Sequence, residues 1–110
     1  MFTAISDDTF DAEVLRSDTP VIVHFTAPWC RPCRAIEPHL VELANAHAGT
    51  VRLVSIDIDA NLATPSRYRV LSIPTVVLFA NGKAVQFVVG AHGKRRFERA
   101  FAPYLPAPES

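Results

Sequence analysis

Hydrophobic positions in the first half of the chain follow two different spacings, which indicate both helices and strands. Phe10 and Val14 lie four residues apart, after polar residues that can cap a helix, so a first helix is predicted there. Residues 21–27 are almost wholly apolar, as is typical of a central strand covered on both faces. Residues 51–58 have the same character and predict a second buried strand.

Between these two strands the apolar residues recur at helical spacing. The pattern predicts a helix from about Pro32 to His47 that buries one of its faces. The residues of that face are Ile36, Leu40, Leu43 and Ala44. Residues 61–69 are mostly polar and predict a short helix after the second strand.

The second half of the chain predicts a hairpin followed by a last helix. Apolar runs at residues 75–80 and 83–89 flank Asn81-Gly82, a dipeptide that favours a two-residue turn between antiparallel strands. Residues 90–93, with a glycine at each end, break the sheet. The last helix is amphipathic, and its apolar side consists of Phe97, Ala100, Phe101, Tyr104 and Leu105.

The predicted order is helix, strand, helix, strand, helix, hairpin and helix. Parallel strands followed by an antiparallel pair predict an α/β fold with a mixed central sheet and helices on both faces. The chain has 110 residues, so we expect one domain that spans residues 1–110. Pro106 and Pro108 predict a frayed tail after the last helix.

Composition and charge narrow the class of protein. The hydrophobic fraction is 49%, which is typical of a globular chain and argues against disorder. The formal net charge is zero, so nothing overall indicates binding to nucleic acid or membrane. The basic residues near the end of the chain are predicted to form a solvated helix face; they are Lys94, Arg95, Arg96 and Arg99.

The start of the chain predicts no targeting segment. Residues 1–8 contain no basic stretch, and acidic residues at 7, 8 and 11 interrupt any apolar run, so we expect no signal peptide. No run of apolar residues is long enough to span a membrane. A reducing cytoplasm is therefore the expected location, and a periplasmic protein whose signal has been removed is the weaker alternative.

Chemistry is concentrated in the segment from Trp29 to Cys33, which holds the only two cysteines. Two cysteines cannot form a framework of several disulfides. Their position between a predicted strand and a predicted helix puts one thiol at a helix N-terminus, where the helix dipole favours a thiolate. A reversible dithiol and disulfide couple is therefore predicted. A closed zinc site is disfavoured because it needs four ligands, and no second pair of cysteines or paired-histidine motif exists.

With these motifs in this order, the chain resembles the thioredoxin family along nearly its whole length. The residues that carry the resemblance are Trp29-Cys30-x-Pro32-Cys33, Pro38, Ile73-Pro74-Thr75, Asn81-Gly82 and Gly90. The resemblance implies the thioredoxin fold and the reduction of protein disulfides, with no cofactor besides a redox-active disulfide. It also implies disulfide-containing substrate proteins and an NADPH-linked reductase of the thioredoxin-reductase type as partners.

The resemblance also implies roles for particular residues. Cys30 would be the attacking thiolate and Cys33 the resolving thiol. Pro74 would follow a cis peptide bond and face the two sulfurs. An apolar surface that receives the substrate would consist of Trp29, Ile73, Gly90 and Ala91. Trp29 and Pro32 are expected to tune the redox couple, and so is Arg31, because its charge lies close to the Cys30 thiolate.

Four positions depart from the usual pattern of the family. His24 replaces an aspartate that usually lies beneath the resolving cysteine, and Ser55 replaces the lysine that accompanies it. Arg31 stands in place of a glycine and Thr26 in place of a tryptophan. The first two changes are chemically consistent, because loss of a buried carboxylate also removes the need for a buried cation.

His24 admits two interpretations. Burial in the strand at residues 21–27 is expected to lower the pKa of the ring below its usual value of about 6.5 and keep it neutral. A neutral imidazole beneath Cys33 can accept the proton of the resolving thiol. The alternative is a core histidine with a satisfied hydrogen bond and no catalytic part. Arg31 likewise is either a tuning charge or an ordinary exposed residue.

Three functions remain open on this fold. The first is a monomeric reductase of protein disulfides, and the second is a more oxidising oxidase or isomerase. The third is a binding or chaperone subunit in which the cysteines matter little. The reduction potential separates the first two, and replacement of both cysteines separates these from the third.

Overall fold

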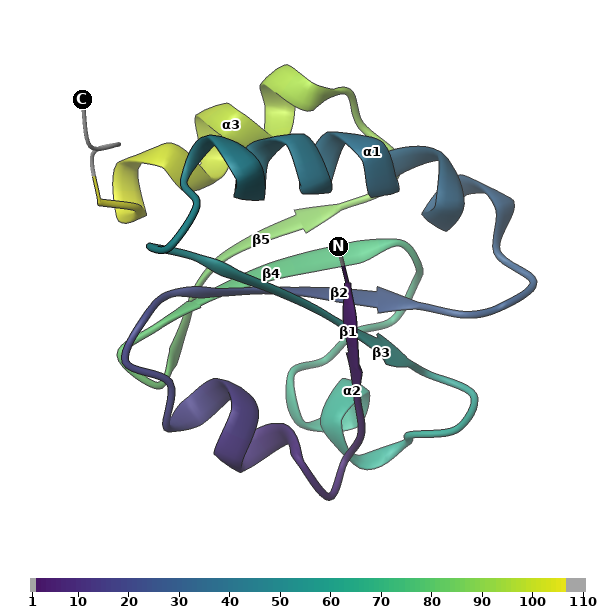
Figure 1. Cartoon of the computed structure of the whole chain (residues 1–110). Coiled ribbons are helices and arrows are strands. Elements are labelled where there is room, and N and C mark those ends of the chain that lie inside the picture. The colour runs from purple at the N-terminus through teal and green to yellow at the C-terminus, as the bar shows by residue number, and fades with distance from the viewer. Residues whose placement is uncertain (1, 107–110) are drawn as a thin grey trace.

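The computed structural model describes residues 2–106, which fold around one sheet (Figure 1). The strands are β1 (Thr3–Ile5), β2 (Val21–Thr26), β3 (Arg52–Asp57), β4 (Thr75–Ala80) and β5 (Lys83–Val89). The helices are α1 (Arg31–Ala46), α2 (Ala63–Arg67) and α3 (Lys94–Phe101). Two single turns complete the described elements: the π-helical η1 (Asp11–Leu15) and the 3-10 turn η2 (Ala102–Tyr104).

The sheet has the order β1-β3-β2-β4-β5, with β2 in the centre. Strands β1 and β2 each pair with β3 in parallel, whereas β4 pairs with β2 and β5 in antiparallel fashion. Helices α1 and α3 cover one face of the sheet, while α2 and η1 lie on the other side (Figure 1). The predicted mixed central sheet with helices on both faces is confirmed.

Strand β2 is buried on both faces because its alternate side chains enter two separate cores. Ile22 packs in the core that contains Ile36 and Leu40 of α1. Val23 and Phe25 point the other way, into the core formed with the segment around η1. Side chains of a strand alternate between the two faces of a sheet, so an almost wholly apolar run is what the central position of β2 requires.

The hairpin between β4 and β5 has the predicted two-residue turn. Asn81 and Gly82 both have positive φ angles, 53° and 77°, which is the conformation that a tight hairpin turn needs. Gly82 is also close to the last residue of η1, because a Cβ at that position would lie 3.0 Å from the carbonyl oxygen of Leu15. The turn therefore needs glycine for both its φ angle and its packing.

The structure differs from the predictions at both ends of the chain. Strand β1 was not predicted; it has only three residues, and its position comes from parallel pairing with β3. The predicted first helix is a single π-helical turn, η1. Helix α3 ends at Phe101 and η2 follows, so Tyr104 lies outside the α-helix. Pro108 lies outside the described residues.

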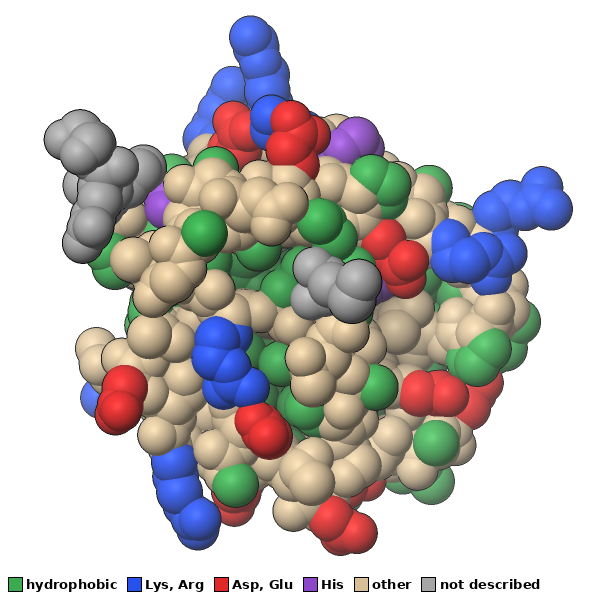
Figure 2. Space-filling model, in the orientation of Figure 1, with side chains coloured by type: hydrophobic (Ala, Val, Ile, Leu, Met, Phe, Trp, Pro, Cys, Tyr) green, Lys and Arg blue, Asp and Glu red, His purple; other side chains and the backbone are tan. Residues whose placement is uncertain are grey.

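On the face of the molecule that Figure 2 shows, acidic and basic side chains are scattered among apolar and neutral ones. Figure 2 shows Lys and Arg side chains projecting into solvent above α3. Lys94 pairs with Glu42 of α1 at 2.7 Å and with Glu98 at 3.4 Å, so part of the basic cluster is locally neutralised. Within residues 2–106, no helix combines the length and apolar character needed to cross a lipid bilayer.

Candidate active site

The two cysteines lie where the chain leaves β2 and enters α1. The Cys30 N–H donates to the carbonyl oxygen of Ala27 at 3.1 Å, which closes the turn between strand and helix. Cys30 is the N-cap residue of α1, and its Sγ accepts the backbone N–H of Cys33 at 3.2 Å. Cys30 and Cys33 form a disulfide, with their Cα atoms 5.3 Å apart. The predicted position of a cysteine at a helix N-terminus is confirmed.

The first turn of α1 provides an electrostatic environment for the sulfur chemistry. The free N–H groups and the positive end of the helix dipole favour negative charge at Cys30. The sequence suits this turn, because Pro32 lies among the first two helical residues, where no partner for a backbone N–H is needed. Arg31 is exposed and adds a positive charge to the same turn.

Apolar residues from three separate segments surround the disulfide. Both cysteines are buried together with Ala27, and Ile58 and Ile73 pack against this group. The peptide bond between Ile73 and Pro74 is cis, as the family resemblance implies. The disulfide is thus covered by a small apolar cluster at one end of the sheet.

Gly90 connects this cluster to the end of β5. Its N–H donates to the carbonyl oxygen of Pro74 at 2.9 Å, and its φ angle is +100°. Ala91 follows and is exposed. The described contacts therefore bring Ile73 to the cysteines and Gly90 to Pro74, whereas Ala91 extends the surface beyond them.

Trp29 lies immediately before the disulfide and is 66% exposed. Its Nε1–H donates to Oδ2 of Asp59 at 2.6 Å, and the N–H of Asp59 donates to Oδ1 of Asp57 at 2.9 Å. This bond fixes a large apolar ring at the surface. Asp59 was not predicted as a site residue, because the contact joins residues that are thirty positions apart and no local motif signals it.

His24 occupies the middle of β2 with none of its surface exposed. Ile22 faces α1, so His24, two residues further along the strand, faces the same side. The ring lies against that of Phe2, with centroids 5.4 Å apart, and His24 pairs in register with Ser55 of β3 and Val76 of β4. Contact between His24 and Cys33 stays a prediction.

The surroundings of the His24 ring favour its neutral form. Burial lowers the pKa of His24 from 6.5 to about 4, because the charged imidazolium loses its hydration. Neither ring nitrogen has a hydrogen-bond partner among the described residues. The described residues therefore do not supply the satisfied hydrogen bond that the alternative of a core histidine requires.

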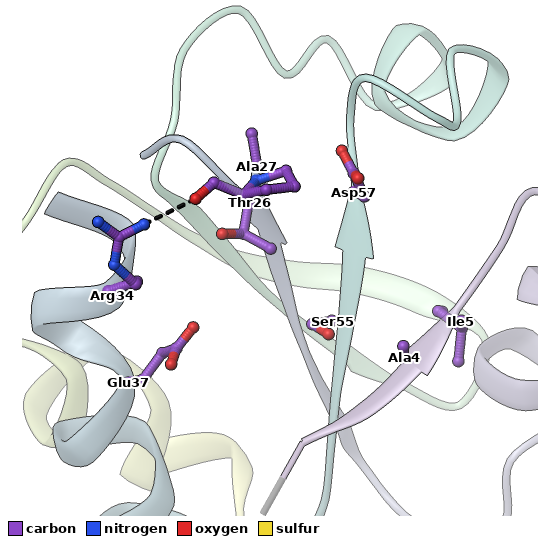
Figure 3. Close-up of a pocket in the computed structure, with 9 residues that line it drawn as sticks. Ala4, Ile5, Thr26, Ala27, Arg34, Glu37, Ser55 and Asp57 are labelled. Atoms are coloured by element: carbon purple, nitrogen blue, oxygen red, sulfur yellow. Dashed lines mark hydrogen bonds between the residues drawn. The ribbon is translucent and has the colours of Figure 1, made fainter. Parts of the chain in front are cut away.

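A pocket of about 280 Å³ opens between α1 and the strands β1 and β3 (Figure 3). Arg34 and Glu37 of α1 face Ser55 and Asp57 of β3 across it. Arg34 is held by a 2.7 Å hydrogen bond to the carbonyl oxygen of Pro28. Because Ser55 lines the pocket and pairs with His24 in the sheet, the pocket reaches the strand position next to the buried ring.

Metal ligands do not gather elsewhere in the described part of the chain. Within residues 2–106, no group of three or more His, Cys, Asp or Glu side chains has the arrangement of a metal site. Thiol–disulfide exchange needs only sulfur atoms, a base and access for the partner disulfide. The geometry around Cys30 and Cys33 provides the two sulfur atoms and an apolar surface.

Comparison with known proteins points to one family. The sequence model of the family described as Thioredoxin matches residues 1–102. Thioredoxin from Streptomyces clavuligerus is 47% identical over 90 residues, which cover 82% of this chain and 83% of that protein. Thioredoxin 1 from Nostoc sp. is 41% identical over 101 residues, which cover 92% and 94% of the two chains.

His24 is expected to make the stability of the protein depend on pH between about 6.5 and about 4. In this range the unfolded chain binds a proton at His24 that the folded protein does not bind. The contribution to the free energy of unfolding should be complete above pH 6.5 and decrease toward pH 4, by roughly 3 kcal/mol in all. Urea unfolding followed by far-ultraviolet circular dichroism measures this.

His24→Val is the control, because it removes the titrating ring and keeps an apolar side chain in β2. The pKa of Asp7 is lowered mainly by its hydrogen bond with Thr64, so this carboxyl titrates below 3.8 in both proteins and cancels in the difference. Between pH 6.5 and about 4, the free energy of unfolding of His24→Val should decrease less than that of the wild type. An equal pH dependence of both proteins would contradict a buried neutral His24.

Proposed function

Because the chain belongs to the thioredoxin family, it is a thiol–disulfide oxidoreductase with the thioredoxin fold, and we propose that it reduces the disulfides of partner proteins. The observation that supports this most directly is the Cys30–Cys33 disulfide at the N-terminus of α1. A helix N-terminus favours the thiolate that starts the reaction. The exposed Trp29 beside it gives a partner protein an apolar surface.

In the proposed mechanism the two cysteines act in sequence. The Cys30 thiolate attacks one sulfur of the partner disulfide, and a mixed disulfide forms while the other partner sulfur leaves as a thiolate. Cys33 then loses its proton and attacks Sγ of Cys30. The second partner thiolate leaves, and the Cys30–Cys33 disulfide closes. Two electrons pass to the partner, which ends as a dithiol after protonation.

We propose that the partner docks on Trp29, Ile73, Gly90 and Ala91, with Pro74 facing the sulfurs. Two observations support this placement. Ile73 packs against the buried cysteines, and Gly90 is hydrogen-bonded to Pro74. The indole of Trp29 is held in place by Asp59, so little side-chain entropy is lost when a partner binds to it.

His24 is proposed to take the proton of Cys33. The ring faces α1, the helix that carries Cys33, and its lowered pKa keeps it neutral at pH 7. A neutral imidazole with a free nitrogen is a proton acceptor, whereas an imidazolium is not. The pocket beside Ser55 offers the proton a route to solvent from the strand position next to His24.

The location, the oligomeric state and the recycling partner are inferred from the family. We propose that the protein acts in the cytoplasm as a monomer and that an NADPH-linked reductase of the thioredoxin-reductase type returns the disulfide to the dithiol. No cofactor besides the redox-active disulfide is needed for this chemistry. Similarity to bacterial thioredoxins supports the assignment.

Cys33→Ser should accumulate a mixed disulfide between Cys30 and insulin, because attack remains possible and resolution does not. Cys30→Ser should accumulate none under the same conditions. Mass spectrometry of the unreduced mixture identifies the linked cysteine. An insulin adduct on Cys33 in comparable yield would reverse the two roles. Survival of the protein's cellular function in a double serine variant would favour the binding or chaperone alternative.

Arg31 should raise the reduction potential only slightly. A unit charge about 7 Å from a thiolate stabilises the reduced form enough to raise the potential by about 10–20 mV. Thioredoxins have potentials of about −270 mV and dedicated oxidants about −120 mV, so one arginine cannot change a reductase into an oxidant. Equilibration with glutathione should show that the reduction potential of Arg31→Gly is lower than that of the wild type by about 10–20 mV.

Arg99→Gly is the matched control for this measurement, because Arg99 is an exposed arginine on α3 rather than on the first turn of α1. It should leave the potential unchanged. A wild-type potential near that of the dedicated oxidants would contradict the reductase proposal and favour the oxidase or isomerase alternative.

His24→Ala should slow the resolving step at pH 7 by on the order of 100-fold and leave the first attack unchanged. The step is isolated by linking Cys30 to a nitrothiobenzoate group and following the release of the coloured thiolate. In the wild type the rate should fall as pH decreases toward about 4, where His24 becomes protonated. His39→Ala, a change on α1, is the control. Equal rates in wild type and His24→Ala at every pH would leave His24 with a packing role.

A further inference from the structure

The loop of residues 90–93 joins β5 to α3 and carries two residues of the proposed docking surface. Gly90 has a φ angle of +100°, and Ala91, His92 and Gly93 are exposed. A loop with two glycines and exposed residues loses much conformational entropy when it is held in one shape. The contacts that hold the loop in one conformation therefore determine whether the docking surface is already formed before a partner binds.

Within the described residues, one hydrogen bond ties this loop to Pro74, which precedes β4, and another ties it to the end of β5. On one side the N–H of Gly90 donates to the carbonyl oxygen of Pro74 at 2.9 Å. On the other side Nε2 of His92 lies 2.8 Å from the carbonyl oxygen of Val89, the last residue of β5. A carbonyl oxygen only accepts, so Nε2 must carry the hydrogen and donate it.

The His92 ring also lies directly beside Gly90. A Cβ on Gly90 would be 3.3 Å from Nε2 and 3.7 Å from Cδ2 of His92, so the imidazole packs along the backbone of this residue. The loop is thus held between the Pro74 carbonyl group and the His92 ring. Of these two contacts only the second depends on a side chain that can be changed without altering the main chain.

We propose that His92 is a positioning residue for the docking of protein disulfides. Its Nε2–H bond to Val89 holds Gly90 and Ala91 in the shape that receives a partner chain. This inference rests on the proposed docking role of Gly90 and Ala91. A protein disulfide needs this surface in order to present its sulfurs to Cys30, whereas a small free disulfide can reach the sulfur without it.

Three variants at one position test the donated bond. The amide nitrogen of Gln is the same number of covalent bonds from Cα as Nε2 of histidine. His92→Gln can therefore restore the hydrogen bond to Val89. Asn reaches only the position of Nδ1, and Leu cannot donate at all, so His92→Asn and His92→Leu should both lose it. His47→Leu, at the far end of α1, is the control for loss of a histidine that contacts a carbonyl oxygen, that of Pro106 at 3.3 Å.

The measurement is insulin reduction with dithiothreitol as the terminal reductant, compared with direct reduction of dithiobis(nitrobenzoate). His92→Leu and His92→Asn should raise KM for insulin about threefold to tenfold with kcat unchanged, as expected for loss of one hydrogen bond. His92→Gln and His47→Leu should have the wild-type KM. None of the variants should change the rate with the small aryl disulfide, and circular dichroism should show all of them folded.

An unchanged KM for insulin in His92→Leu would overturn the inference. An equal rise of KM in His92→Gln and His92→Leu would also overturn it, because the shape of the ring and not its donated bond would then be responsible. These outcomes are distinct from failure of the proposed function, which would appear as a wild-type protein that does not reduce insulin at all.

Discussion

The burial of β2 on both faces is the constraint on which the rest of the structure depends. A strand in the centre of the sheet is covered on both sides, so its mostly apolar side chains supply both cores. The chain can only turn away beyond Thr26 and return across the sheet as α1. This turn puts Cys30 at the helix N-terminus, and the position of the disulfide is therefore a consequence of topology as much as of sulfur chemistry.

Much of the fold could be predicted because the signals are local. The strands β2 and β4, the helix α1 and the turn at Asn81-Gly82 all follow from short-range patterns. Strand β1 could not be predicted, because three residues with one buried side chain carry no periodicity and depend on pairing with β3. In the site the cysteines were evident from the sequence. The hydrogen bond between Trp29 and Asp59 forms only when distant segments meet, and the one between His92 and Val89 forms only when the loop adopts its shape.

The family resemblance implies a buried aspartate and lysine at the positions that His24 and Ser55 occupy in this chain, and the two pairs differ in their cost of burial. A buried carboxylate carries a large desolvation penalty, and a cation beside it offsets only part of this. A neutral imidazole avoids the penalty and needs no counter-ion, so a small residue at position 55 is sufficient. The small side chains of Ala4 and Ser55 lie side by side in the sheet and leave the pocket beside the ring.

The hydrogen bond between Trp29 and Asp59 has a consequence for optical experiments. The chain contains a single tryptophan, and this residue lies next to the disulfide with 66% of its surface exposed. Its emission is therefore expected to respond to the redox state of the adjacent sulfurs. The indole is already largely in contact with water, so complete unfolding adds comparatively little to its hydration. Fluorescence and circular dichroism of this molecule consequently describe different events, one local to the sulfurs and one global.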